Sequence, residues 1–289
     1  MSRALTIGFI GLGDMGGHIA ERIVEHGHAV IVADKRPEAV KRLTAVGAEV
    51  ASSLTTLAAA CDVIFLCVVD DQQVLSLAQD HLITAMRAGT TLVVLSSVRP
   101  ETMNDLRVLL PEGCGISLLD SPVSGSRPAA AAGKLTLMVG GDLTILDKIR
   151  PILESFSERI FHTGPLGSGQ AMKIANNLIL HMNHLVALEA VRFARTQGIA
   201  EDSLIDIVNT SSGRSWVTEN WGLIDDMFHN HPQAGTAGIY DMMVKEMWSA
   251  VMLSRKTEAG LPLTGLGVQV SRAFYMERER DLKTKIPNN

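Results

Sequence analysis

The chain has 289 residues, of which 46% are hydrophobic, 20% charged and 4% aromatic, with a formal charge of −5 at pH 7. This composition is typical of a folded protein with a largely aliphatic core and argues against disorder. At roughly 100–200 residues per domain, the length favours two domains over one, and the acidic balance gives no support to nucleic acid as a partner.

The three cysteines, Cys61, Cys67 and Cys114, include no C-x-x-C pair. Cys61 and Cys67 flank or lie in an apolar run, which is typical of buried thiols. Nothing before Leu5 resembles a signal peptide, and no apolar run reaches the ~18 residues that a membrane span needs. We therefore expect a reduced, cytoplasmic protein that has no membrane partner.

The first half of the chain alternates short apolar runs with amphipathic stretches. The runs are β-branched or Leu-rich and predict buried strands at residues 7–10, 29–33, 63–68, 91–95, 116–119 and 135–139. Helices are predicted between them, for example at 37–46 and 72–86. This alternation predicts an α/β fold, a doubly wound parallel sheet with helices on both faces.

After Gly164 the apolar residues recur at helical spacing. Helices are predicted at 168–197, 203–208, 217–227, 240–258 and 262–277. We therefore expect a dinucleotide-binding domain at 1–164 and an all-helical domain for substrate binding and dimerisation at 165–289. The first of these helices is long and mostly apolar, so we expect a homodimer or homotetramer that associates through the helical half.

A glycine-rich segment, Gly11-Leu12-Gly13-Asp14-Met15-Gly16, follows the first predicted strand and opens a helix. Glycines here allow a tight turn and a close approach of backbone N–H groups to a pyrophosphate, which the helix N-terminus also favours. Gly-rich turns also arise for steric reasons alone, but the flanking strand and helix favour a Rossmann-type dinucleotide site. Gly11, Gly13, Met15 and Gly16 are the predicted cofactor contacts.

Asp34 lies at the end of the second predicted strand, roughly 20 residues after the glycines. An acidic side chain at this position accepts hydrogen bonds from the ribose hydroxyls and repels a 2′-phosphate. The alternative is a helix cap before Pro37, and Lys35 and Arg36 are compatible with a phosphate. The pattern favours NAD over NADP as the cofactor.

Two further segments carry polar groups suited to a substrate, and the first of them lies at the expected carboxyl edge of the sheet. Residues 120–126, D-S-P-V-S-G-S, follow a strand, and their small residues leave backbone N–H groups available to a carboxylate, although a plain turn also explains them. Gly164 to Gly169 lead into a helix that carries Lys173 and Asn177, four residues apart on one face. This pair suits proton exchange with a substrate oxygen. A solvated helix face is the structural alternative.

His181 and His184 form an H-x-x-H pattern on the same helix. No carboxylate or cysteine stands nearby at a spacing suited to a shared metal ion. Helix packing accounts for both histidines, and we expect no metal.

Four segments in this order resemble the β-hydroxyacid dehydrogenase family, which includes 3-hydroxyisobutyrate dehydrogenases, tartronate semialdehyde reductases and L-threonate dehydrogenase-like enzymes. The matching segments are G-L-G-D-M-G at 11–16, S-P-V-S-G-S at 121–126, the G-x-x-G-x-G-x-x-x-K-x-x-x-N pattern at 164–177 and V-K-E at 244–246. Together they span nearly the whole chain.

The resemblance implies hydride transfer between NAD and a small 3-hydroxy acid, or its semialdehyde or keto form. It assigns the roles as follows: Lys173 as general acid/base, Asn177 as the residue that positions Lys173 and the substrate, Ser124, Gly125 and Ser126 at the substrate carboxylate, and Val68, Val69, Ser97 and Lys245 at the cofactor.

Departures from the family pattern bear on the substrate. Ser126 replaces a usual Gly, Glu246 a usual Asp, and residues 211–216, S-S-G-R-S-W, are closer to the threonate dehydrogenase-like branch. Arg214 in that segment is either a contact for a second polar group of the substrate or a surface residue. The alternatives on this fold are an imine reductase, a decarboxylating dehydrogenase and a non-catalytic NAD-responsive binding protein. Lys173 counts against the first and the last.

Overall fold

The computed structural model describes residues 4–230 and 238–285. By its internal contacts the chain divides into two compact units, residues 1–173 and 174–289. The dividing point lies within one long helix, α8 (Ser168–Thr196), so the first turn of that helix belongs to the first unit.

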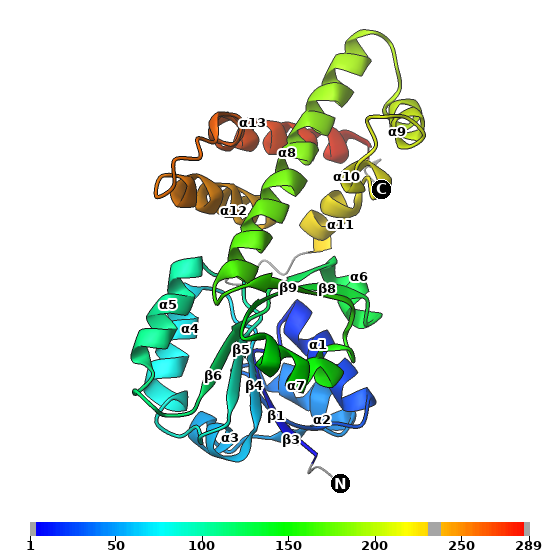
Figure 1. Cartoon of the computed structure of the whole chain (residues 1–289). Coiled ribbons are helices and arrows are strands. Elements are labelled where there is room, and N and C mark those ends of the chain that lie inside the picture. The colour runs from blue at the N-terminus through cyan, green and yellow to red at the C-terminus, as the bar shows by residue number, and fades with distance from the viewer. Residues whose placement is uncertain (1–3, 231–237, 286–289) are drawn as a thin grey trace. The chain divides into compact units, whose positions relative to one another are not determined.

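The first unit is built on one sheet (Figure 1). Its strands are β1 (Thr6–Ile10), β2 (Ala29–Ala33), β3 (Glu49–Val50), β4 (Val63–Leu66), β5 (Thr91–Val94), β6 (Ser117–Asp120), β7 (Val123–Ser124), β8 (Leu135–Gly141) and β9 (Ser157–Gly164). Their order is β3-β2-β1-β4-β5-β6-β8-β7, with β9 paired to β8. The first six positions in that order are parallel, so the carboxyl ends of those strands share one edge.

Helices cover both faces of this sheet because alternate strand residues face opposite layers. One layer contains α1 (Asp14–Glu25), α2 (Pro37–Ala45), α6 (Ser126–Ala131) and α7 (Leu143–Leu153), and the other contains α3 (Leu54–Ala60), α4 (Asp71–Leu77) with the π turn Ala78–Leu82, and α5 (Pro100–Leu109). Phe65 of β4 packs into the first layer and Leu66 into the second. The predicted doubly wound α/β fold is confirmed.

The second unit is helical in its described residues. It contains the rest of α8, α9 (Glu201–Asn209), α10 (Trp216–Glu219), α11 (Leu223–Asn230), α12 (Ile239–Ser254) and α13 (Pro262–Lys285). Leu185 and Leu188 of α8 pack with Met243 and Met247 of α12 and with Tyr275 of α13. No helix in the two described ranges combines the length and apolar character required to cross a membrane.

One predicted helix and three strands differ from the sequence-based expectation. The single helix predicted at 217–227 is two helices, because Gly222 has φ +91° and ends the helical path between α10 and α11. The strands β3, β7 and β9 were not predicted. The first two have only two residues each, and the sequence of β9, SERIFHTG, has one aliphatic residue and mostly exposed or half-buried side chains.

Candidate functional site

The glycine-rich loop joins β1 to α1 at the carboxyl edge of the sheet. Gly11 has φ +95°, and a Cβ there would lie 2.2 Å from the carbonyl oxygen of Cys67. A Cβ at Gly16 would lie 2.1 Å from the carbonyl oxygen of Gly11, so helix and turn are in backbone contact. Gly11 and Gly16 are therefore required by the fold of the loop itself.

Gly13 differs from these two glycines. A Cβ at this position would meet nothing closer than a guanidinium nitrogen of Arg36 at 4.0 Å. Gly13 is the N-cap of α1 and supplies no side-chain capping hydrogen bond. An open face beside the N-terminus of a twelve-residue helix fits the pyrophosphate of a dinucleotide, because backbone N–H groups and the helix dipole both favour an anion there. Met15, in the first turn, is half-buried against the core.

Asp34 directly follows β2, and its carboxylate is already hydrogen-bonded. It accepts from the backbone N–H of Leu12 at 2.6 Å and from that of Arg36 at 2.8 Å. The Arg36 guanidinium donates to both carboxylate oxygens, at 3.0 and 3.1 Å. Burial acts to raise the pKa of the Asp34 carboxyl, but the hydrogen bonds from Arg36 and Leu12 hold it below its ordinary value. The carboxylate is thus ionised and oriented beside the glycine-rich loop.

The loops after β4 and β5 meet at the same edge. The backbone N–H of Val68 donates to Ser96 Oγ at 2.8 Å, which joins the two loops directly. Val69 is 67% exposed and Ser97 is exposed beside the buried Ser96 and Val98. Val69 and Ser97, which are both predicted to contact the cofactor, are therefore exposed to solvent. They lie on two loops that are hydrogen-bonded to each other.

The loop predicted to hold the substrate carboxylate follows β6. Ser124 belongs to the short strand β7, and Ser124, Gly125 and Ser126 are half-buried. Gly125 has φ +137° and Ser126 has φ +62°, which is left-handed backbone in a residue that carries a Cβ. A glycine adopts this conformation without the roughly 1–2 kcal/mol cost of a Cβ, which is a physical reason for the glycine usual in this position.

Lys173 and Asn177 lie four residues apart on α8, Lys173 half-buried and Asn177 4% exposed. Asn177 Oδ1 accepts from Asn176 Nδ2 at 3.1 Å. Lys173 is the last residue of the first unit, whereas Asn177 belongs to the second.

Lys245 of α12 is exposed, also in the second unit. Its neighbour Glu246 contacts a buried histidine of α8. Glu246 Oε2 lies 2.6 Å from Nε2 of His181, and His181 is 3% exposed. This pair joins α8 to α12 within the second unit.

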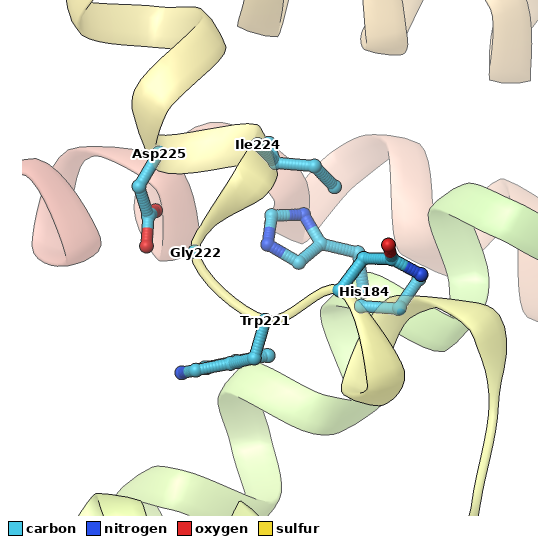
Figure 2. A pocket seen from close by; sticks show the side chains of 7 residues that line it. His184, Trp221, Gly222, Ile224 and Asp225 are labelled. Atoms are coloured by element: carbon cyan, nitrogen blue, oxygen red, sulfur yellow. The ribbon is translucent and has the colours of Figure 1, made fainter. Parts of the chain in front are cut away.

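His184 lines a small cavity in the second unit (Figure 2). The cavity has a volume of about 10 Å³, room for about one water molecule, and Trp221, Gly222, Ile224 and Asp225 also line it. His184 stacks on Tyr275 with ring centroids 5.6 Å apart. Among the described residues no group of three or more His, Cys, Asp or Glu side chains is arranged to hold a metal ion.

Arg214 is an exposed side chain that pairs with Glu219, its Nε 3.3 Å from Oε1. Arg214 thus has an ion-pair partner within the second unit, and its contact with a substrate stays a prediction.

Sequence reasoning did not identify the structural roles of two buried polar residues at the carboxyl edge, Asp120 and Gln170. Asp120, at the end of β6, accepts from the backbone N–H of Gly167 at 2.6 Å and of Gln170 at 2.8 Å. The Gln170 side chain donates to the carbonyl of Ser96 at 2.8 Å and accepts from the N–H of Val98 at 3.0 Å. These contacts attach the first turn of α8 to the loops after β5 and β6. The only local signal was a carboxylate at the end of an apolar strand.

Two family models cover nearly the whole chain. Residues 6–164 match the NAD binding domain of 6-phosphogluconate dehydrogenase. Residues 167–286 match the model described as NAD-binding of NADP-dependent 3-hydroxyisobutyrate dehydrogenase.

Individual relatives also align over almost their full length. NAD-dependent L-serine dehydrogenase of Pseudomonas aeruginosa is 31% identical over 97% of each chain. 2-(Hydroxymethyl)glutarate dehydrogenase of Eubacterium barkeri is 32% identical over 96% of this chain and 93% of its own. The structure of Mycobacterium tuberculosis 3-hydroxyisobutyrate dehydrogenase with L-serine is 29% identical over 94% of each chain, with a TM-score of 0.82.

Proposed function

The chain belongs to the β-hydroxyacid dehydrogenase family and is a nicotinamide-dependent dehydrogenase, and we propose that it transfers hydride between NAD and a small 3-hydroxy acid. One observation carries the proposal furthest. Gln170 of α8 is hydrogen-bonded to both neighbours of Ser97, and Lys173 follows three residues later on the same helix. The amine is thus on a helix turn that starts at the cofactor edge of the sheet, which supports Lys173 as the general acid/base.

The substrate class follows from what three relatives have in common. Their names refer to L-serine, 2-(hydroxymethyl)glutarate and 3-hydroxyisobutyrate. Each of these compounds is a carboxylate whose second carbon bears a CH₂OH group, and they differ only in the other substituent on that carbon. We infer a 2-substituted 3-hydroxypropanoate as the substrate and the corresponding semialdehyde as the product.

In the proposed mechanism the chain binds, orients and moves a proton. Backbone N–H groups of the Ser124–Ser126 loop hold the substrate carboxylate. Asn177 positions the hydroxyl, and Lys173 Nζ accepts its proton during oxidation and returns it during reduction. NAD, when bound, supplies the hydride acceptor, and the Gly11–Gly16 loop with Asp34 holds the dinucleotide.

We propose NAD as the preferred cofactor, because the ionised Asp34 carboxylate repels a 2′-phosphate. Arg36 is the opposing feature, since its guanidinium lies against Asp34 and is 56% exposed. The proposed cofactor preference therefore depends on which of these two neighbouring charges faces the ribose.

The direct test is an assay of the purified full-length chain with NAD and with NADP. The substrates are L-serine, 3-hydroxyisobutyrate, 2-(hydroxymethyl)glutarate and unsubstituted 3-hydroxypropanoate, each followed by absorbance of the reduced cofactor. We expect turnover with at least one of these primary alcohols and a higher kcat/KM with NAD. Turnover of L-threonate or of a cyclic imine, together with none of the four acids, would overturn the substrate class.

We also propose that the chain forms a homodimer or homotetramer through α8. Met172, Ile179, Val186 and Phe193 recur every seven residues along that helix and are 48–68% exposed. A seven-residue apolar repeat on one helix face is typical of packing against another helix. A second copy of the same chain is the proposed occupant, since it brings an equal apolar stripe.

A further inference from the structure

The side chain of Gln170 spans the residue predicted to contact the cofactor. Gln170 is 1% exposed, and its amide uses both ends, with Nε2 donating to the carbonyl of Ser96 and Oε1 accepting from the N–H of Val98. Ser97, between those two residues, is exposed. One side chain from α8 therefore fixes the backbone on both sides of Ser97 and leaves the Ser97 side chain directed outward.

Further hydrogen bonds connect Ser96 and Gln170 to two other loops of the sheet. On one side Ser96 Oγ accepts from the N–H of Val68, at 2.8 Å, which brings in the loop after β4. On the other side the Gln170 N–H donates to Asp120 Oδ2, and the Gly167 N–H donates to Asp120 Oδ1. A series of buried and partly buried hydrogen bonds thus connects the loops after β4, β5 and β6 with the start of α8.

The backbone at this junction is packed too closely for a side chain at Gly169 or Gly140. A Cβ at Gly169 would lie 2.2 Å from the carbonyl oxygen of Met138 and 2.7 Å from Asp120 Oδ2. A Cβ at Gly140 would lie 2.5 Å from Asp120 Oδ1. The helix start is therefore in backbone contact with β8 as well as hydrogen-bonded to Asp120.

Asp120 is 0% exposed, and it faces N–H donors in this junction. Burial raises the pKa of its carboxyl, and the N–H groups of Gly167 and Gln170 act against that shift. Gly167 directly precedes α8 and Gln170 lies in its first turn, so the start of the helix and the buried carboxylate stabilise each other.

We propose that Gln170 is a positioning residue that sets the register between the cofactor loop at Ser97 and the helix turn that carries Lys173. The position of the Lys173 amine relative to a dinucleotide bound at the Ser97 loop then stays the same through the reaction. The effect on hydride transfer rests on the proposed function, whereas the effect on the loop and on cofactor affinity does not.

The test variant is Gln170→Met, which keeps the length of the side chain and removes both hydrogen bonds. The matched control is Thr90→Val. Thr90 is 2% exposed, precedes β5 at its opposite end, and donates to the carbonyl of Cys61. Gln170→Met loses two buried hydrogen bonds and Thr90→Val loses one, in each case to a loop of the same sheet, but only Gln170→Met loses them at the carboxyl edge.

Three readouts separate the variants. In Gln170→Met we expect the Val98 amide to exchange its hydrogen about tenfold faster, as after loss of one hydrogen bond, and NADH to bind about tenfold more weakly. With a substrate found in the acid panel, kcat should fall about 10²-fold, as for a misplacement of about 1 Å, and a primary deuterium isotope effect should accompany it. Thr90→Val should match the parent chain in all three.

A second variant, Gln170→Ala, also removes both hydrogen bonds but replaces Gln170 with a smaller side chain. It should likewise speed exchange of the Val98 amide and weaken NADH binding, and it carries the test if Gln170→Met does not fold. Parent-like amide exchange and NADH affinity in a folded Gln170→Met would overturn the proposal. If no acid is turned over, only the proposed function fails, because exchange and NADH affinity are still measured.

Discussion

A single carboxylate, Asp34, bears on the choice of cofactor. It accepts from Leu12 and from both the backbone and the guanidinium of Arg36, so ribose hydroxyls must share it with these donors. In Asp34→Ser the negative charge is lost and Arg36 is released toward the ribose. We expect the ratio of kcat/KM for NAD over NADP to fall at least about tenfold, or about 1.4 kcal/mol.

The control for this prediction is Asp142→Ser. Asp142 also accepts from backbone N–H groups, those of Thr144 and Ile145, but at the N-terminus of α7. Its replacement should leave the NAD/NADP ratio unchanged. An unchanged ratio in Asp34→Ser as well would remove Asp34 from cofactor selection.

Lys173 is the residue on which the proposed chemistry depends. Lys173→Ala should lower kcat by about 10²–10⁴-fold, the usual contribution of a positioned acid/base, and leave NADH affinity within about twofold. The measurement is steady-state kinetics with the best acid of the panel, with Lys148→Ala, an exposed lysine of α7, as the control. A kcat within a few-fold of the parent value would assign the proton transfer to another group.

At the scale of elements, α8 and α13 meet around a histidine that stays neutral. His184 stacks on Tyr275, with a centroid distance of 5.6 Å, and is 3% exposed. Burial lowers the pKa of His184 to about 4, against the opposing charge of Asp225. Its Nδ1 has no hydrogen-bond partner among the described residues. Charging this ring is therefore unfavourable in the folded chain at neutral pH.

This packing predicts a pH dependence of stability. Between the ordinary pKa of 6.5 and the folded value of about 4, the unfolded chain binds a proton that the folded chain does not. Stability should therefore fall as the pH drops from about 6.5 toward 4, by up to roughly 3 kcal/mol. Urea unfolding at pH 7, 5.5 and 4.5 measures this loss.

His184→Phe keeps the ring stack and removes the titrating group. Between pH 7 and 4.5 this variant should therefore lose less stability than the parent chain, by up to roughly 3 kcal/mol. His81→Gln, at an exposed histidine of the first unit, should retain the slope of the parent chain. Equal slopes in the parent chain and His184→Phe would show that other groups account for the pH dependence.

At the scale of the whole molecule, the apolar stripe of α8 determines the expected assembly. Ile179 and Val186 are 60% and 59% exposed. The double variant Ile179→Lys/Val186→Lys should sediment as a monomer, because it places two charges in a contact that must lose water. Val108→Lys, at a 78% exposed valine of α5, tests the effect of a new lysine elsewhere and should keep the parent mass. A monomeric parent chain would refute assembly through α8.

Local patterns were sufficient for most of the architecture. The apolar runs at β1, β2, β4, β5, β6 and β8 predicted strands because a strand buried on both faces must be apolar at nearly every position. The glycines at 11 and 16 were also recognised locally, because the close approaches they permit occur within one turn and its neighbouring strand. Their roles toward the cofactor, the roles of Lys173 and Asn177, and the domain boundary after residue 164 stay predictions.

The sequence by itself determined the α/β and helical halves and the family, because both depend on short-range periodicity and on ordered motifs. Only the tertiary structure decided which side chains support the site. Gln170 meets Ser96 across 74 residues of sequence, Gly167 meets Asp120 across 47, and His181 meets Glu246 across 65. Contacts over such separations leave no periodic trace in the chain, because they depend on how the strands are ordered in the sheet and how the helices pack.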